Sequence, residues 1–171
     1  MSEAERFQPQ ELLRRLVDSG ARFVVIGGLA AQAHGSTSIT RDLDICFSRD
    51  PDNLGRLVAV LSDVLAIRRG LARDSPRMPP LDVRTLRATS LLTLDTRFGA
   101  FDLLANPDPG FDYETLLRSS EEAEVLGVSV RFAGLDDLMA MKRAAGRPKD
   151  LIELEVLGAL REEIDRRRRG P

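Results

Sequence analysis

Histidine and cysteine are the scarcest reactive residues in this chain of 171 residues, which has one of each, His34 and Cys46. A single cysteine excludes a framework of disulfides within the chain. Zinc sites and catalytic triads built on histidine need several such groups together, so neither class of site has support. We expect His34 to pack or to cap at a helix end rather than to catalyse.

Aromatic residues and long apolar runs are also scarce. Aromatic side chains make up 5% of the sequence, and tryptophan is absent. No apolar run approaches the roughly 20 residues of a membrane helix, and the polar first ten residues do not resemble a signal peptide. We therefore expect a cytoplasmic protein with no membrane partner. The net charge of −2 gives no general basic field for nucleic acid, and we expect the arginines at 166–169 to be a solvated tail that could also contact RNA.

Lysine is nearly absent beside arginine. Of the 25 basic residues, only Lys142 and Lys149 are lysines, and they lie close together in the sequence. Lysine offers a compact, rotatable point charge that arginine does not reproduce. The pair therefore indicates a place where an ammonium group is needed, although chance is an equally good explanation.

One stretch, at 22–47, carries the strongest chemical pattern. A short run rich in β-branched residues ends at Gly27 and Gly28, and a small helix and a polar turn follow. The next extended run holds Asp42 and Asp44, whose side chains point to the same face of a strand because they are two residues apart. Two adjacent carboxylates repel each other unless a cation lies between them. We interpret the stretch as a divalent-metal site beside a glycine turn suited to phosphate.

Asp102 is a carboxylate in the middle of the apolar run FDLL at 101–104. An unpaired charge is costly there, and aspartate is disfavoured in strand interiors. If this strand lies beside the one with Asp42 and Asp44, a third carboxylate joins the metal site. Alternatively, Asp102 forms an ion pair with Arg97 or another arginine.

The apolar periodicity predicts an α/β (α+β) fold, in which a small mixed sheet is flanked by helices and followed by a C-terminal helical part. We expect a core at 1–110 and the helical part at 111–171, packed together as one compact unit. The loop at 70–83 is either a flap over the site or a plain connector. The last helix should bury Leu151, Leu154, Leu157, Leu160 and Ile164. The expected helices span 9–19, 29–34, 50–70, 111–117, 135–145 and 149–166, and the expected strands span 22–26, the run with Asp42 and Asp44, and hairpins at 89–105 and 124–132.

Three blocks of the sequence resemble the nucleotidyltransferase fold of the polymerase β superfamily, in particular the AbiEii-like and minimal bacterial nucleotidyltransferases of toxin–antitoxin type. The blocks are GGLAAQAHGSTSITRDLDI at 27–45, FDLL at 101–104 and MKRAAGRPKDLIEL at 141–154. They occur in the expected order and extend over most of the chain. Two positions depart from the pattern, since Ser38 replaces a frequent arginine and Glu153 replaces a frequent aspartate.

The resemblance implies a role for each matching residue. The glycine turn would bind the nucleoside triphosphate through backbone N–H groups, the carboxylates would bind Mg²⁺ or Mn²⁺, and a lysine would contact the triphosphate. The implied catalytic residues are Asp42, Asp44, Asp102 and Lys142, of which the three aspartates are the metal ligands. The implied nucleotide-binding residues are Gly27, Gly28, Thr40, Lys142, Arg147 and Asp150.

The resemblance thus implies a Mg²⁺-dependent enzyme that moves a nucleoside monophosphate from an NTP such as ATP to a hydroxyl group. The acceptor would be the 3′ end of tRNA or a protein side chain, and the chain would be the toxin of a pair with an antitoxin protein as partner. One alternative is a nucleotide-binding or protein-binding module with the same fold and little or no catalysis. Another is that the acidic residues form an incidental network of salt bridges with the many arginines.

Overall fold

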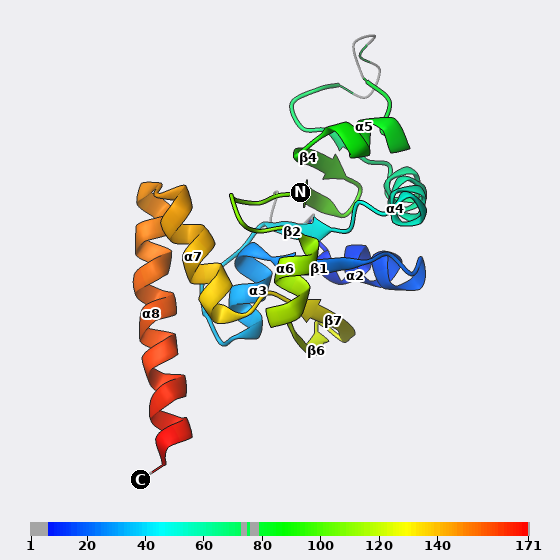
Figure 1. The fold of residues 1–171 in the computed structure, drawn as a ribbon. Helices are drawn as coiled ribbons and strands as arrows, with labels where there is room; N and C mark the ends of the chain where they lie inside the picture. Colours follow the sequence, from blue (N-terminus) through cyan, green and yellow to red (C-terminus); the bar gives the residue numbers. More distant parts are fainter. Residues whose placement is uncertain (1–6, 73–74, 76–78, 171) are drawn as a thin grey trace.

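A single mixed sheet forms the centre of the molecule in the computed structural model, which describes residues 7–72, 75 and 79–170. Within these residues, seven strands follow the spatial order β3-β4-β5-β2-β1-β7-β6 (Figure 1). The β2–β5 and β1–β7 pairs are parallel, and the other neighbouring pairs are antiparallel. The strands are β1 (Phe23–Ile26), β2 (Asp42–Phe47), β3 (Ile67–Arg68), β4 (Leu91–Thr96), β5 (Gly99–Leu104), β6 (Glu121–Val125) and β7 (Val128–Phe132).

Helices flank this sheet, as the expected α/β (α+β) class requires. α3 packs on β1 and β2, α7 packs on α3, and α8 packs on α7, while α2 and α6 also contact the central strands. No helix among the described residues is both long and apolar enough to cross a membrane. The helices are α2 (Pro9–Asp18), α3 (Gly27–Ala33), α4 (Pro51–Asp63), α5 (Val83–Ala88), α6 (Tyr113–Ser119), α7 (Leu135–Ala145) and α8 (Pro148–Arg169).

The core lies where the apolar pattern of the sequence is densest. All four residues of β1 are buried, which suits a β-branched and aromatic run at the centre of a sheet. In α2, Leu12, Leu13 and Leu16 are fully buried, at the spacing of one helix face. The expected hairpin at 89–105 is present as β4 and β5, with Thr96 opposite Gly99 at the turn.

The segment after α4 differs from the prediction of a helix up to residue 70. α4 ends at Asp63, and Leu65 takes a positive φ of 54°, which a helix cannot accommodate. The chain then forms the two-residue strand β3, which pairs with β4. A short helix, α5, which the periodicity did not predict, follows the loop at 70–82, and residues 73–74 and 76–78 of that loop lie outside the described part of the chain.

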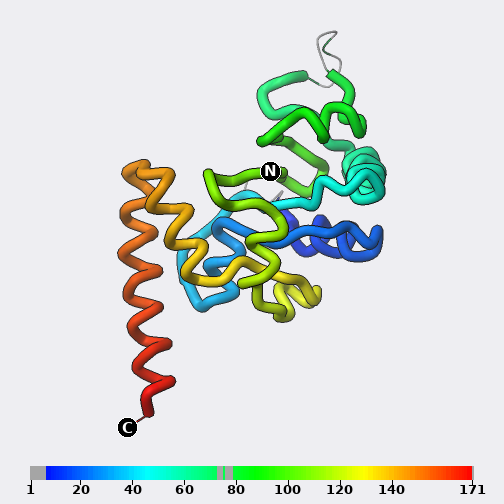
Figure 2. Tube along the Cα trace, in the orientation of Figure 1, coloured from blue at the N-terminus to red at the C-terminus, as the bar shows by residue number. Residues whose placement is uncertain are grey.

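The predicted apolar stripe of the last helix is confirmed in part. Leu157 is buried and Leu160 and Ile164 are partly buried against the core, while Leu151 is 54% exposed and the neighbouring Ile152 is 66% exposed. Figures 1 and 2 show α8 lying against α7 at one side of the molecule, so its partner is another helix and not the sheet. A helix periodicity predicts a burial pattern only where a partner surface exists.

Candidate metal and nucleotide site

Three carboxylates meet on one face of the sheet. β2 and β5 run parallel in a register that sets Asp44 opposite Asp102 and Asp42 opposite Ala100. One carboxylate oxygen from each of Asp42, Asp44 and Asp102 lies within 4.8 Å of the other two, and all three residues are partly buried. The structure therefore brings together the three metal-ligand candidates of the sequence, from two strands that are far apart along the chain.

The electrostatics of this triad favour a cation. Burial, followed by repulsion from Asp42 and Asp102, raises the pKa of Asp44 to about 7. Burial also raises the pKa of Asp102, while the nearby Arg69 guanidinium acts in the opposite direction. Carboxylates that are held together against this penalty gain most from a bound positive charge. Clustered oxygen ligands of this kind suit Mg²⁺ or Mn²⁺.

Gly27 makes room for the Asp44 carboxylate. A Cβ at Gly27 would lie 2.1 Å from Asp44 Oδ2, and the glycine has a φ of +65°. Similarly, a Cβ at Gly28 would lie 2.6 Å from the Thr40 side chain. The glycine pair therefore lets the start of α3 approach β2 closely, and no side chain caps this helix start. This close fit is independent support for a built site.

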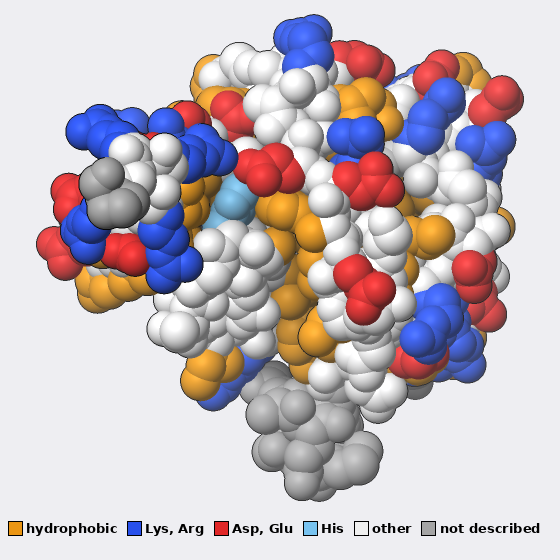
Figure 3. Space-filling model, turned by 90° about the horizontal axis from the view of Figure 1, so that it is seen from below, with side chains coloured by type: hydrophobic (Ala, Val, Ile, Leu, Met, Phe, Trp, Pro, Cys, Tyr) orange, Lys and Arg blue, Asp and Glu red, His pale blue; other side chains and the backbone are white. Residues whose placement is uncertain are grey.

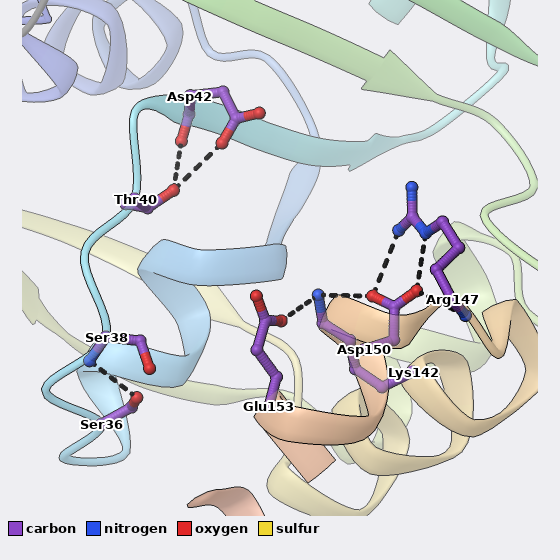
Figure 4. A network of polar contacts seen from close by, with 8 residues as sticks. All are labelled: Ser36, Ser38, Thr40, Asp42, Lys142, Arg147, Asp150 and Glu153. Atoms are coloured by element: carbon purple, nitrogen blue, oxygen red, sulfur yellow. Dashed lines mark hydrogen bonds and ion pairs between the residues drawn. The ribbon is translucent and has the colours of Figure 1, made fainter.

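A basic cluster of Lys142 and Arg147 at the corner of α7 and α8 lies across the site from Asp42 (Figure 4). Lys142 Nζ lies 3.3 Å from Asp150 Oδ1 and also forms an ion pair with Glu153. Arg147 donates from Nε to Asp150 Oδ2 at 2.6 Å and from Nη2 to Oδ1 at 3.2 Å. These cations, led by Arg147, lower the pKa of the fully buried Asp150 to about 2. Asp150 thus holds Lys142 and Arg147 together from a buried position.

A cavity of about 400 Å³ joins the two sides of the site. Thr40 lies on its wall and donates from Oγ1 to Asp42 Oδ1 at 3.0 Å. Of the residues implicated by sequence, Gly27 and Asp150 are absent from the wall, because one lies behind Asp44 and the other is buried in the α7–α8 corner. The implicated residues on the wall are Gly28, Thr40, Asp42, Asp44, Asp102, Lys142 and Arg147.

Arg69 is a residue of the site that the sequence did not indicate. It follows β3, lines the cavity and donates from Nη2 to Asp102 Oδ1 at 2.7 Å. The sequence left open a pair of Asp102 with Arg97 or another arginine; the pair is formed by Arg69, while Arg97 lies 3.6 Å from Asp63. The only feature of the sequence that marks Arg69 is the pair of arginines before Gly70, and that pair lies in a run with the apolar spacing of a helix. Lys149 and Ile39, also without an assigned role, lie on the cavity wall as well.

His34, Cys46 and the arginines at the end of α8, which the sequence analysis did not assign to the site, have contacts elsewhere in the structure. His34 Nε2 lies 2.9 Å from the Ala133 carbonyl oxygen, and its ring packs edge-on against Phe132. Cys46 is buried, and burial raises the pKa of its thiol to about 12, which leaves it unreactive. At the end of α8, Arg166 and Arg167 pair with Glu163. On the face shown in Figure 3, acidic and basic side chains are interspersed.

The chain was compared with protein-family models and with curated proteins. No protein-family model matches the chain. No curated protein matches it either.

Proposed function

We propose that the chain is a Mg²⁺-dependent nucleotidyltransferase with the nucleotidyltransferase fold of the polymerase β superfamily. It would move a nucleoside monophosphate from a nucleoside triphosphate to a hydroxyl group. The observation that carries the proposal is the triad of Asp42, Asp44 and Asp102 within 4.8 Å. Its setting between the close-packed turn at Gly27 and Gly28 and the basic cluster that contains Lys142 adds support.

The residues of the cavity divide the reaction between them. The acceptor oxygen would form a bond to the α-phosphorus of the triphosphate, and the bond to pyrophosphate would break. When bound, Mg²⁺ supplies charge stabilisation at the attacking and leaving oxygens. Asp42 and Asp44 would hold two ions, whereas Asp102 would hold the one near the acceptor. As a carboxylate beside that ion, Asp102 would also take the proton of the acceptor hydroxyl.

The opposite wall would bind the triphosphate. Lys142 Nζ is a point charge on a flexible side chain, and both of its present partners lie on α8. A turn of this ammonium toward the cavity would place it against the departing pyrophosphate, which carries concentrated negative charge. Gly28 lies against Thr40, which bonds Asp42 on the carboxylate side of the cavity, so the start of α3 would receive phosphate oxygens from that side.

A nucleotide-binding or protein-binding module with the same fold and little catalysis is the second candidate. Two contacts favour it, because Arg69 occupies an oxygen of Asp102 and two carboxylates occupy Lys142. An incidental salt-bridge network is less well supported. No basic side chain of the described residues forms an ion pair with Asp42 or Asp44.

The test is transfer of label from NTPs. The purified protein is incubated with each α-³²P-labelled NTP, Mg²⁺ and either total RNA or a protein lysate, and the fractions are separated by electrophoresis. Transfer to either fraction that requires Mg²⁺ and is lost in Asp44→Asn supports the proposal. If NTP with Mg²⁺ raises the melting temperature but no fraction is labelled, the binding module replaces the enzyme.

A toxin role with an antitoxin partner rests on the resemblance. Growth arrest on expression of the wild-type chain, abolished by Asp44→Ala at equal protein level, would support it. The acceptor found in the labelling experiment, the 3′ end of tRNA or a protein, would then be the target. Normal growth of cells that express active enzyme would contradict the toxin role without affecting the enzymatic proposal.

A further inference from the structure

Arg69 connects the acidic triad to a second part of the surface. Its backbone N–H donates to the Thr93 carbonyl oxygen at 3.0 Å, which fixes the main chain beside β4. The guanidinium has three acceptors: Asp102 Oδ1 at 2.7 Å, the Leu94 carbonyl oxygen at 3.1 Å and Asp95 Oδ1 at 3.3 Å. Arg69 is therefore held by two carboxylates, of which only Asp102 belongs to the triad.

The position of Arg69 allows its guanidinium to move away from Asp102. It lines the cavity of the candidate site and also a neighbouring cavity of about 480 Å³, whose wall includes Asp95 and Thr96. Its side chain is 36% exposed, whereas that of Asp102 is 13% exposed. Loss of the Asp102 contact would leave the pair with Asp95 in place. The guanidinium can thus leave Asp102 without becoming an unpaired charge.

We infer that Arg69 is an internal counter-ion that competes with divalent metal for Asp102. In the metal-free protein, its positive charge offsets part of the repulsion among Asp42, Asp44 and Asp102. Because a metal ion would need the same carboxylate, binding displaces the guanidinium toward Asp95. This inference rests on the proposed function, since it assumes that the triad binds metal.

The experiment measures Mn²⁺ binding by calorimetry at pH 8 without nucleotide, together with the melting temperature with and without Mn²⁺. Arg69→Ala should bind Mn²⁺ about fivefold more tightly, the effect of losing a competing ion pair of ordinary strength. Without metal it should melt below the wild type, because the triad loses its counter-ion, and Mn²⁺ should raise its melting temperature by more. Arg69→Lys retains the charge and should bind Mn²⁺ with an affinity between those of the wild type and Arg69→Ala.

Arg97→Ala is the matched control. Arg97 lies in the turn between β4 and β5 and is 43% exposed, but it pairs with Asp63 outside the site. It should leave Mn²⁺ affinity unchanged. If the wild type binds Mn²⁺ and transfers nucleotides, but the Mn²⁺ affinity of Arg69→Ala equals or falls below that of the wild type, the counter-ion role alone is overturned. If the wild type binds no Mn²⁺ at millimolar concentration, the counter-ion role and the proposed function both fail.

Discussion

At the scale of single residues, Gly27 shows how steric room and electrostatics combine. The residue has a positive φ and faces the Asp44 carboxylate at a distance that admits no Cβ. Gly27→Ala should lower the free energy of unfolding by about 2 kcal/mol or more, because the left-handed conformation and the clash both carry a cost. It should also abolish metal binding, since Asp44 must move. Urea unfolding and Mn²⁺ calorimetry measure the two effects.

Gly55→Ala provides the control for this substitution. Gly55 lies in α4, and a Cβ there would meet nothing within 4 Å. Alanine in a helix interior should stabilise the protein by up to about 1 kcal/mol without an effect on the metal. Equal metal binding by Gly27→Ala and wild type would refute the close fit between Gly27 and Asp44.

Asp44 should make stability depend on pH in the metal-free protein. Its pKa is about 7 in the folded state, above the ordinary value of 3.8. The folded state therefore binds more protons between these values, so Asp44's contribution to stability is full at low pH and is lost as pH rises from 4 to 7. The full shift corresponds to about 4 kcal/mol. Burial is the largest cause of the raised pKa, Asp42 and Asp102 raise it further, and Lys142 and Arg69 lower it.

Unfolding in urea from pH 5 to 8 with EDTA, for the wild type and Asp44→Asn, checks this linkage. The variant should lack the loss of stability that the wild type shows toward pH 7. With Mn²⁺ the trend should reverse, because protons and metal compete for the same carboxylate and deprotonation favours the metal. Parallel curves for the two proteins would show that Asp44 titrates normally.

The sequence was informative for residues whose chemistry is unusual for their place. Asp42 and Asp44 alternate in a strand, and Asp102 interrupts an apolar run, so each carboxylate was conspicuous. Arg69 was not, because an arginine at the end of an apparent helix is ordinary. Its role depends on the turn at Leu65 and on pairing with β4, which no local pattern of the sequence encodes.

At the scale of elements, the corner between α7 and α8 depends on one buried carboxylate. Gly146 ends α7 with a φ of 61°, and Asp150 accepts from the backbone N–H of Arg147 at the start of α8. Asp150→Asn should lower the free energy of unfolding at pH 7 by about 2–3 kcal/mol, since Lys142 and Arg147 lose their shared partner. Urea unfolding followed by circular dichroism measures the loss.

Asp165→Asn is the comparison on the same helix. Asp165 pairs with Arg161 at a half-exposed position, so its loss should cost less than about 1 kcal/mol. The lowered pKa of Asp150 adds a second signature: its contribution is present above pH 4 and is lost as pH falls from 4 toward 2. If both variants lose the same stability, Asp150 does not organise the corner.

Among the elements, periodicity served best where the sheet determines burial. β1 and α2 were expected within a residue or so of their bounds, and both lie in the core. α8 was expected at nearly the right place, and Leu157, Leu160 and Ile164 of its predicted stripe pack on the core, but Leu151 is exposed because the partner of α8 is another helix and not the sheet. The end of α4 was missed because the apolar spacing continues past Asp63, while the backbone turns at Leu65.

At the scale of the whole molecule, the site draws on distant parts of the chain. The carboxylates belong to β2 and β5, and the basic cluster lies at the corner where α7 ends and α8 begins. A boundary at residue 110, as expected from sequence, runs through the sheet, since β7 follows that residue and pairs with β1. The sheet and the cavity therefore tie the segments on both sides of this boundary together.

This shared sheet predicts one cooperative unfolding transition. Tyr113 is the only tyrosine and tryptophan is absent, so its fluorescence reports locally on α6, which contacts β1 and β2. Urea curves from Tyr113 fluorescence and from circular dichroism at 222 nm should coincide, because a two-state domain loses all its structure together. Mn²⁺ should shift both curves equally, since ligand binding stabilises the entire cooperative unit. Separate midpoints would instead mean that the C-terminal helices unfold on their own, and the basic cluster would then be a mobile attachment to the carboxylates rather than part of one preorganised site.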